Sequence, residues 1–572
     1  MNTQGPQQPF SDNLHATKYR SPGESFGESQ DRFASALTIC PEHYQATREI
    51  VRNMRFMGGG RTQAACGAPK LVTPYNCFVS GVIEDSFVQG EGCIMDRARD
   101  AAATMRMGGG IGYDFSTLRP RGATIKKLDS LASGPVSFMD IFNAVCKCTA
   151  SSGNRRGAQM GVLRVDHPDI EEFVQAKQNS DRLTGFNISV GVTDEFMEAV
   201  QAGTSFDLRW GGEVWRTIDA RNLWEMIMRS TYNWAEPGVL FIDRINEQNN
   251  LGYCETIVAT NPCGEQPLPP NGACLLGSFN LTRYVGSTRD GYWVFDMEQF
   301  RQDIPWIVRA MDRVVDVANF PLMEQKAEAL SKRRMGLGVT GVANAIEALD
   351  PAMVYGNGLF LEQMEDIMRT LRDEAYRASV QLARELGPFP KFDREEYLAR
   401  PFIQTLPEDI REGIAKYGIR NSHLLSVAPT GTISLCADNI SSGIEPVFAY
   451  QQERVLQTPD GEERHTLPDY GVRVFGVEGK RAEEVKPEEH LAVLALAQRY
   501  VDSSVSKTIN LPKDIDWDDF KEVYMKAWQL GCKGCTTYRP GKRGAVLTSK
   551  DDDKEEATAC YLDPLTGRKE CE

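Results

Sequence analysis

Residues 261–265, with the sequence Asn-Pro-Cys-Gly-Glu, bring an amide, a thiol and a carboxylate together within five positions. Pro262 fixes φ and removes a backbone donor, whereas Gly264 permits a tight bend. Four prolines between positions 262 and 270 exclude a helix interior and disfavour a central strand. The pattern predicts a stiff, irregular loop that presents polar side chains. A second thiol, Cys274, follows eleven residues after the thiol of this stretch, and the alternative interpretation is a Pro-rich surface loop with two incidental cysteines.

The other cysteines fall into groups according to the sequence around them. The chain has fourteen cysteines and no basic, apolar leader at its start, which indicates a reducing compartment, so we expect a cytoplasmic protein with free thiols. Most are expected to be buried as small hydrophobic residues. This group contains Cys40, Cys66, Cys93, Cys146, Cys148, Cys254 and Cys436.

Two further thiols, Cys560 and Cys571, follow an almost entirely charged run over residues 548–558. Such a run predicts a disordered, solvated linker, in which cysteines have no core to pack in. A tail that delivers reducing equivalents is the favoured interpretation. A zinc site shared with Cys532 and Cys535 is the alternative, although Cys560 and Cys571 are eleven residues apart rather than the usual two to four.

Phosphate binding is predicted at a loop that follows an apolar segment. Residues 424–434 resemble a buried strand that opens into a Thr/Gly/Ser loop, and backbone amides at such a strand end commonly hold phosphate. The lysine of a P-loop is absent. A second loop, residues 151–160, is basic and flanked by glycines, so Arg155 and Arg156 could pair with an anion, with a solvated loop as the alternative.

Composition limits the class of protein. Strand-like and helical segments alternate along 572 residues, which favours an α/β fold with mainly parallel strands. The net charge of −15 argues against a nucleic-acid or anionic-membrane surface, and no apolar run is long enough for a transmembrane helix. We expect an N-terminal arm over 1–40, either flexible or an ordered strap, a catalytic domain over 41–547 and a flexible redox tail over 548–572.

Five motifs together resemble the ribonucleotide reductase family. They are NPCGE with Cys274, RRMGLGVTG at 333–341, APTGTIS with GIEP between 428 and 446, SVSKTINLP at 504–512 and GCKGCTTYRPG at 531–541. The similarity covers about residues 40–547 and is greatest to class II, the dimeric enzymes that depend on adenosylcobalamin. The radical-carrying tyrosine pair of class I has no counterpart, since only Tyr538 lies near that end.

The resemblance implies a ten-stranded α/β barrel made of two five-stranded parallel halves, with a central finger loop formed by the 261–270 segment. It assigns Cys263 as the thiyl radical, Glu265 as the base on the 3′-hydroxyl and Asn261 as a partner of the ribose hydroxyls. Cys77 and Cys274 would supply two electrons and become a disulfide, which requires Cα atoms within about 7 Å.

The resemblance also assigns binding roles. Cys560 and Cys571 would reduce the Cys77–Cys274 disulfide and be reset by a thioredoxin- or glutaredoxin-like partner. A dNTP or ATP specificity effector would bind near residues 119–134 and 151–161, where Arg155 and Arg156 are expected contacts. The enzyme would be a homodimer without a structural metal. The residues expected to contact substrate are Asn76, Gly110, Ala428, Pro429, Thr430, Gly431, Thr432, Ile433 and Ser434.

The resulting hypothesis is an adenosylcobalamin-dependent enzyme that reduces ribonucleoside diphosphates to 2′-deoxyribonucleotides for DNA synthesis. Reduction of triphosphates is the nearest alternative. A non-catalytic nucleotide-binding protein with thiols or zinc is a further alternative, but it leaves the Asn–Cys–Glu cluster on a stiff loop unexplained.

Overall fold

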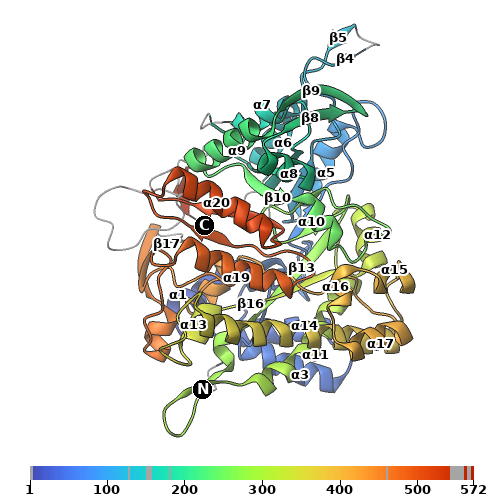
Figure 1. The fold of residues 1–572 in the computed structure, drawn as a ribbon. Coiled ribbons are helices and arrows are strands. Elements are labelled where there is room, and N and C mark those ends of the chain that lie inside the picture. Colours follow the sequence, from blue (N-terminus) through green and yellow to red (C-terminus); the bar gives the residue numbers. More distant parts are fainter. Residues whose placement is uncertain are drawn as a thin grey trace.

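The computed structural model of the chain describes residues 4–125, 129–149, 157–178, 182–458, 461–540, 560–562 and 569–571. It has a mixed α/β architecture in which helices surround a large central sheet (Figure 1). This arrangement confirms the α/β fold that the alternation of strand-like and helical segments predicts.

Ten strands of the described chain form one sheet, in the order β1-β13-β2-β3-β6-β7-β10-β20-β19, with β16 beside β13. Side chains of β6, β7, β13 and β16 are almost all buried, as expected for strands covered on both faces. The bounds are β1 Phe56–Gly58, β2 Cys77–Val79, β3 Gly110–Asp114, β6 Gln159–Arg164, β7 Phe186–Val192, β10 Gly238–Phe241, β13 Ala273–Asn280, β16 Met335–Thr340, β19 Thr508–Asn510 and β20 Gly534–Tyr538.

Strand directions divide this sheet into two sets. Strands β2, β3, β6, β7 and β10 pair in parallel, as do β13 with β16 and β19 with β20. The sets meet at two antiparallel pairs, β2–β13 and β10–β20. Isolated parallel bridges, Leu337–Leu425 and Val427–Val505, extend the second set from β16 toward β19.

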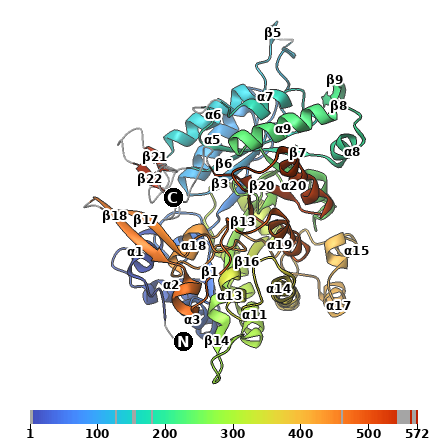
Figure 2. The ribbon, with the colours of Figure 1, turned by 60° about the vertical axis from the view of Figure 1, so that its left-hand side comes forward.

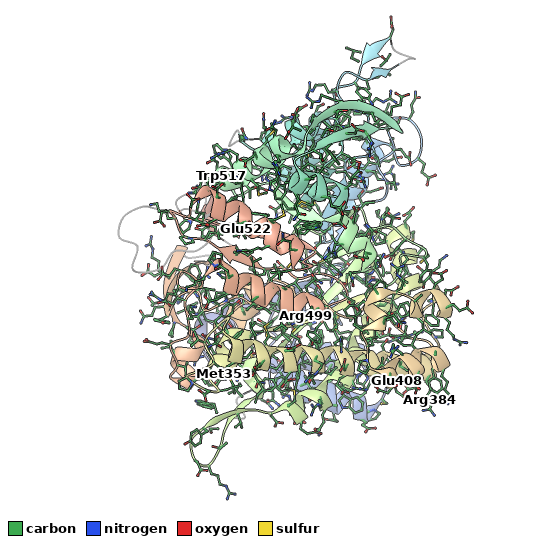
Figure 3. The ribbon with its side chains drawn as sticks, in the orientation of Figure 1. Met353, Arg384, Glu408, Arg499, Trp517 and Glu522 are labelled. Carbon is green, nitrogen blue, oxygen red and sulfur yellow. The ribbon has the colours of Figure 1, made fainter. Side chains whose placement is uncertain are left out.

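Helices cover the sheet on the sides of both sets, and Figures 1 and 2 show α5 to α9 beside the first set and α11, α14 and α19 beside the second. The amphipathic helix predicted over 358–386 is confirmed as α14, which ends before Gly387 at φ +84°. The bounds are α5 Ile94–Arg106, α6 Pro135–Cys148, α7 Ile170–Gln175, α8 Asp194–Ala202, α9 Ala220–Trp234, α10 Ile242–Glu247, α11 Met297–Val317, α12 Met323–Lys332, α13 Val342–Glu347, α14 Gly358–Leu386, α15 Arg394–Leu398, α16 Pro401–Gln404, α17 Glu408–Tyr417, α18 Gly431–Cys436, α19 Pro487–Arg499 and α20 Trp517–Gln529. Figure 3 shows side chains on the outer helices, among them Arg499 at the end of α19 and Trp517 at the start of α20.

The N-terminal segment is an ordered strap over its described residues. It contains α1 Pro9–Tyr19 and α2 Phe26–Leu37, followed by α3 Pro41–Arg52 and α4 Gly60–Ala65. Helix α2 begins with a reciprocal capping box between Ser25 and Glu28. Helix α1 packs against α18, more than 400 residues later in the chain (Figure 2).

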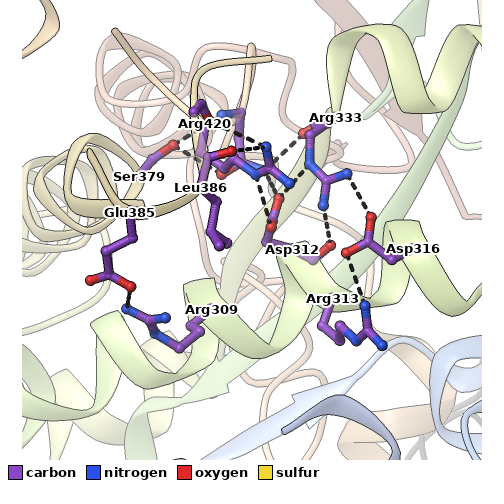
Figure 4. A network of polar contacts seen from close by, with 11 residues as sticks. Arg309, Asp312, Arg313, Asp316, Arg333, Ser379, Glu385, Leu386 and Arg420 are labelled. Carbon is purple, nitrogen blue, oxygen red and sulfur yellow. Dashed lines mark hydrogen bonds and ion pairs between the residues drawn. The ribbon is translucent and has the colours of Figure 1, made fainter. Parts of the chain in front are cut away.

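A buried polar network fixes the residues that lead into the second parallel set (Figure 4). Arg333, which precedes β16 at φ +49°, donates to Asp312 Oδ1 and Asp316 Oδ1, each at 2.8 Å. Arg420 donates to Asp312 Oδ2 at 3.2 Å, and Asn421 donates to the Arg333 carbonyl at 3.0 Å. Because residues 424–427 follow directly, this network holds the start of the predicted phosphate segment beside β16.

Shorter hairpins and turns complete the described chain. In that part of the chain no helix is long and apolar enough to cross a membrane. The hairpin strands are β4 Thr124–Ile125 with β5 Ser130–Leu131, β8 Ser205–Trp210 with β9 Glu213–Asp219, β11 Ala259–Thr260 with β12 Pro267–Leu268, β14 Val285–Ser287 with β15 Trp293–Phe295, β17 Gln451–Thr458 with β18 Gly461–Pro468, and β21 Cys560–Leu562 with β22 Lys569–Cys571. Two short helical turns are η1 Leu281–Tyr284 and η2 Gly471–Phe475.

Candidate active site

The Asn-Pro-Cys-Gly-Glu stretch is the turn of a small hairpin, between β11 and β12. The Asn261 N–H donates to the Gln266 carbonyl at 3.1 Å, and the Gly264 N–H donates to the Asn261 carbonyl at 3.1 Å. Gly264 has φ +82°, a conformation that favours glycine. Cys263 lies in this turn with its side chain exposed. The predicted loop is therefore present as the turn of a short hairpin, in which Cys263 is exposed while Asn261 and Glu265 are buried.

This loop passes between the two parallel sets of strands. On one side, the Thr260 carbonyl lies so close to β3 that a Cβ on Gly112 would clash with it. On the other side, the Glu265 carbonyl accepts hydrogen bonds from Ser426 Oγ at 2.9 Å and the Ser504 N–H at 3.1 Å. The backbone of the loop is thus fixed from both sides.

Cys77 and Cys274 are brought together by sheet register. They are directly opposed in the antiparallel pair of β2 and β13, and opposed residues in such pairs have Cα atoms about 4.5–5.5 Å apart. That separation is suitable for a disulfide. Both are free thiols and almost fully buried. Burial raises the pKa of each thiol well above its ordinary value, and the Glu265 carboxyl adds to the effect at Cys77.

Asn261 and Glu265 face the same thiol. Asn261 Nδ2 donates to Cys77 Sγ at 3.2 Å, and the Cys77 thiol donates to Glu265 Oε1 at 3.8 Å. Glu265 is 2% exposed, and its second oxygen, Oε2, has no hydrogen-bond partner. Burial raises the pKa of the Glu265 carboxyl, whereas a hydrogen bond from Asn261 opposes the shift. A buried carboxyl with one unused oxygen is suited to exchange a proton with a bound ligand.

These groups border a cavity of about 260 Å³. Its lining combines the reactive loop, the glycines before β3 and the segment that precedes α18. The lining residues named by the sequence are Asn76, Cys77, Gly110, Asn261, Cys263, Glu265, Ala428, Pro429, Thr430, Gly431, Thr432 and Ile433. Cys274 and Ser434 are not part of the lining: Cys274 is fully buried in β13, and Ser434 lies inside α18.

The predicted phosphate segment has a defined hydrogen-bond pattern. Thr430 has φ +56°, and its hydroxyl lies 2.9 Å from Thr340 Oγ1 and accepts from the Gly443 N–H at 2.7 Å. The Ser434 hydroxyl donates to the Gly431 carbonyl at 2.9 Å. Ser434 therefore stabilises the first turn of α18, and the residues before it face the cavity. The expected strand before this loop is present as the bridges at Leu425 and Val427.

Several lining residues were not identified from the sequence. They are Tyr19, Gly59, Gly60, Met105, Gly108, Gly109, Gly157, Ala158, Pro262, Leu276, Gly277 and Ser278. The glycines at 58–60 lead from β1 into α4, and Gly59 and Gly60 line the cavity. A run of three glycines beside the similar run at 108–110 was the available signal, since glycine permits close approach of backbone to a ligand.

The remaining predictions have mixed outcomes. Arg155 and Arg156 lie outside the described residues. Cys532 and Cys535 are buried and belong to the main hydrophobic core, and the described part of the chain contains no group of three metal-ligating side chains.

The prediction of burial is correct for Cys66, Cys93, Cys146 and Cys436, but it is wrong for Cys40, Cys148 and Cys254, which are exposed. Cys40 and Cys148 lie at helix ends, where one side of the chain faces solvent.

The site combines an opposed pair of buried thiols with a carboxyl and a third, accessible thiol. In an α/β protein this combination is typical of a thiol-dependent oxidoreductase. A family model described as "Ribonucleotide reductase, barrel domain" matches residues 75–470 and 473–538. The chain belongs to the ribonucleotide reductase family.

Curated relatives agree with this assignment. A protein of Thermoplasma acidophilum named vitamin B12-dependent ribonucleoside-diphosphate reductase is 34% identical, with 93% of this chain and 70% of that protein covered. A protein of the same name from Mycobacterium tuberculosis (strain CDC 1551 / Oshkosh) is 35% identical, with coverage of 94% and 79%. A vitamin B12-dependent ribonucleotide reductase of Streptomyces coelicolor is 28% identical, with coverage of 86% and 59%.

Proposed function

We propose that the chain is a class II ribonucleotide reductase, which uses adenosylcobalamin to convert ribonucleoside diphosphates to 2′-deoxyribonucleoside diphosphates. The observation that carries the proposal is the register that opposes Cys77 and Cys274 beside Asn261, Glu265 and Cys263 in one cavity. The names of the relatives from Thermoplasma and Mycobacterium support the cofactor and the diphosphate substrate.

The exposure pattern of the site fits this cofactor. Asn261, Glu265, Cys77 and Cys274 are all buried, whereas Cys263 is exposed and can be reached from outside. When bound, adenosylcobalamin would supply the radical chemistry that converts the Cys263 thiol to a thiyl. The protein's own contribution is to hold that thiol on a backbone fixed from two sides.

In the proposed reaction the Cys263 thiyl removes the 3′-hydrogen of the ribose. Glu265 takes the proton of the 3′-hydroxyl, which its unpartnered Oε2 can accept. Asn261 holds the ribose hydroxyls through its amide. The 2′-hydroxyl then leaves as water after it gains a proton from the thiol pair.

Electrons and atoms balance through the thiol pair. Cys77 and Cys274 lose two hydrogens and form one disulfide, while the 2′-carbon exchanges its hydroxyl for hydrogen and one water is released. Cys263 returns a hydrogen to the 3′-carbon and is a thiyl again. The raised pKa of both buried thiols keeps them protonated and therefore able to give protons as well as electrons.

Substrate phosphates would bind at residues 428–433, where the cavity meets the first turn of α18. Asn76, Cys77 and Gly110 would line the nucleoside. The buried and unpartnered Oδ1 of half-buried Asn76 supports this role, because a buried polar atom without a partner is expected to gain one from a ligand.

The tail would recycle the active-site disulfide. Cys560 and Cys571 are opposed in the β21–β22 hairpin, so their backbone register supports a pair despite the spacing of eleven residues. This pair would reduce the Cys77–Cys274 disulfide by thiol exchange. A thioredoxin- or glutaredoxin-like protein would then reduce the tail.

The proposed effector site and the proposed homodimer follow from the resemblance to the family. An effector dNTP or ATP would bind near the β4–β5 hairpin and residues 151–161, and Arg155 and Arg156 remain proposed contacts. A homodimer is supported by exposed apolar side chains beside α5 and α6, namely Val82, Phe87, Val88 and Met95.

We also infer that the two bridges beyond β16 close the sheet into a barrel of two five-stranded parallel halves around the Cys263 loop.

Reconstitution tests the proposal. The purified chain is incubated with CDP, adenosylcobalamin and dithiothreitol, and dCDP is measured by chromatography. We expect turnover that requires no second subunit. Cys263→Ser should abolish it while CDP binding stays near normal, and Cys254→Ser, which removes another exposed thiol, should retain it. Activity in Cys263→Ser would refute the radical assignment, and dependence on a di-iron or di-manganese partner would place the enzyme in class I.

A further inference from the structure

The first part of the N-terminal strap, residues 4–20, is anchored at Asp438, just beyond the C-terminal end of α18. The backbone N–H groups of Gln7 and Gln8 donate to Asp438 Oδ1 at 2.7 and 2.9 Å, and Gln8 Nε2 donates to the Asp438 carbonyl at 2.9 Å. Asp438 is fully buried. A buried carboxylate held by backbone donors is costly to separate from them, so this anchor resists displacement.

The strap also packs along α18 itself. The Ser11 hydroxyl donates to the Leu435 carbonyl at 2.6 Å. Leu14 and Tyr19 belong to one hydrophobic cluster with Ile433, and Ile433 also borders the cavity. The strap and the phosphate segment therefore form a single packed unit, although more than 400 residues separate them in the sequence (Figure 2).

Tyr19 is the strap residue that reaches the cavity. It is 8% exposed and contributes to the cavity lining beside Gly59 and Gly60. A Cβ on Gly60 would lie 2.9 Å from Tyr19 Cε1 and 3.0 Å from its hydroxyl oxygen, so the ring edge rests directly on this glycine. The His15 ring packs edge-on against the Tyr19 ring at 5.4 Å, and Arg32 donates to the Tyr19 carbonyl at 3.3 Å.

The position of Tyr19 corresponds to the phosphate end of the cavity. The reactive loop borders the cavity through Asn261, Cys263 and Glu265. Tyr19 belongs to one hydrophobic cluster with Ile433, the last of the predicted phosphate residues that line the cavity. A phosphate chain that extends past Ile433 would therefore approach the Tyr19 ring. The buried anchor at Asp438 prevents that ring from retreating without undocking the strap.

We propose that Tyr19 closes the phosphate end of the substrate cavity and limits the accepted nucleotide to two phosphates. The inference rests on the reductase function proposed above and identifies what selects its substrate class. A diphosphate ends before the ring, whereas the third phosphate of a triphosphate requires the space that the ring occupies. Selection by exclusion of this kind depends on the rigidity of the wall.

The test compares CDP and CTP as substrates of the full-length enzyme with adenosylcobalamin and dithiothreitol. In the wild type we expect kcat/KM for CDP to exceed that for CTP by about tenfold or more. Tyr19→Ala should lower this ratio by about tenfold, mainly through a smaller KM for CTP. Tyr19→Phe keeps the ring and should leave the ratio within about twofold of the wild type.

Phe10→Leu is the matched control, because Phe10 belongs to the same strap and cluster but not to the cavity lining. It should leave the ratio unchanged. Folding is checked by thermal melting, and Tyr19→Leu replaces Tyr19→Ala if the latter does not fold. An unchanged ratio in a folded Tyr19→Ala or Tyr19→Leu enzyme overturns the inference, as does an equal shift in Phe10→Leu.

Equilibrium binding of CDP and CTP separates this inference from the proposed function. If the wild type binds CDP in preference to CTP and Tyr19→Ala removes the preference, the role of Tyr19 in excluding the third phosphate is supported, even where no turnover occurs. A wild type that reduces neither nucleotide refutes the proposed reaction but not the role of Tyr19. A wild type that binds both nucleotides equally refutes the role of Tyr19.

Discussion

Replacing Gly112 with alanine should displace the Cys263 loop from its place between the strands. A Cβ at this position would lie 1.8 Å from the Thr260 carbonyl oxygen, whereas real Cβ atoms keep at least 3.0 Å. The loop or strand β3 must therefore move by about 1.2 Å or more, the difference between these two distances. Overpacking of this kind typically costs about 1–3 kcal/mol of folding free energy.

The larger effect is expected on catalysis. A misplacement of about 1 Å can lower a rate roughly a hundredfold when reacting groups must be aligned. Thr260 adjoins Asn261, so the shift is transmitted directly to the residues that face Cys77. We therefore expect kcat for CDP reduction by Gly112→Ala to fall by about a hundredfold.

The assay measures kcat for CDP reduction and the melting temperature of each variant. Gly191→Ala is the matched control, because Gly191 lies in β7 of the same sheet and its added Cβ would meet atoms only at 3.6 Å and beyond. It should stay near the wild type in both measurements. If Gly112→Ala melts like the wild type and keeps its kcat within about twofold, the close approach of loop and strand does not position the site.

Three further predictions concern the redox and acid–base groups. Cys274→Ser should abolish reduction in a single turnover of prereduced enzyme, because Cys77 loses the partner of its disulfide; retained product formation would contradict that pairing. Cys560→Ser should slow multiple turnover with a thioredoxin-type reductant but spare a single turnover, and equal loss in both assays would exclude the shuttle. The pKa of Glu265 is raised, and a base acts only when deprotonated, so kcat/KM should fall as the pH drops through this raised pKa. Glu265→Gln should lose this acidic limb along with most activity, and a limb that persists in Glu265→Gln would assign it to another group.

The reactive loop could be predicted because its signal is local. Prolines and a glycine within ten residues determine the backbone of the loop, and the Asn, Cys and Glu side chains are adjacent in sequence. The helix α14 was predictable for the same reason, since its apolar periodicity and its terminal glycine lie within one segment.

Contacts between distant segments could not be derived in this way. Nothing in the local sequence pairs Cys77 with Cys274, because sheet register depends on the folding of the residues between them; the resemblance to a family supplied that pairing. The composition of the N-terminal arm left a flexible arm and an ordered strap equally open. Its order depends on Asp438, about 430 residues away, which no window of the sequence connects to Gln7.

The long-range anchor of the strap has a consequence for the synthesis of the protein. Residues 4–20 leave the ribosome long before their docking partner at Asp438, which is made about 430 residues later. At about 5–20 residues per second this interval lasts roughly 20–90 s. During that time Phe10, Leu14 and Tyr19 have no α18 to cover them, so the nascent chain carries an apolar segment that chaperones can bind. The cavity is completed only when Tyr19 meets a segment that is made more than 400 residues later.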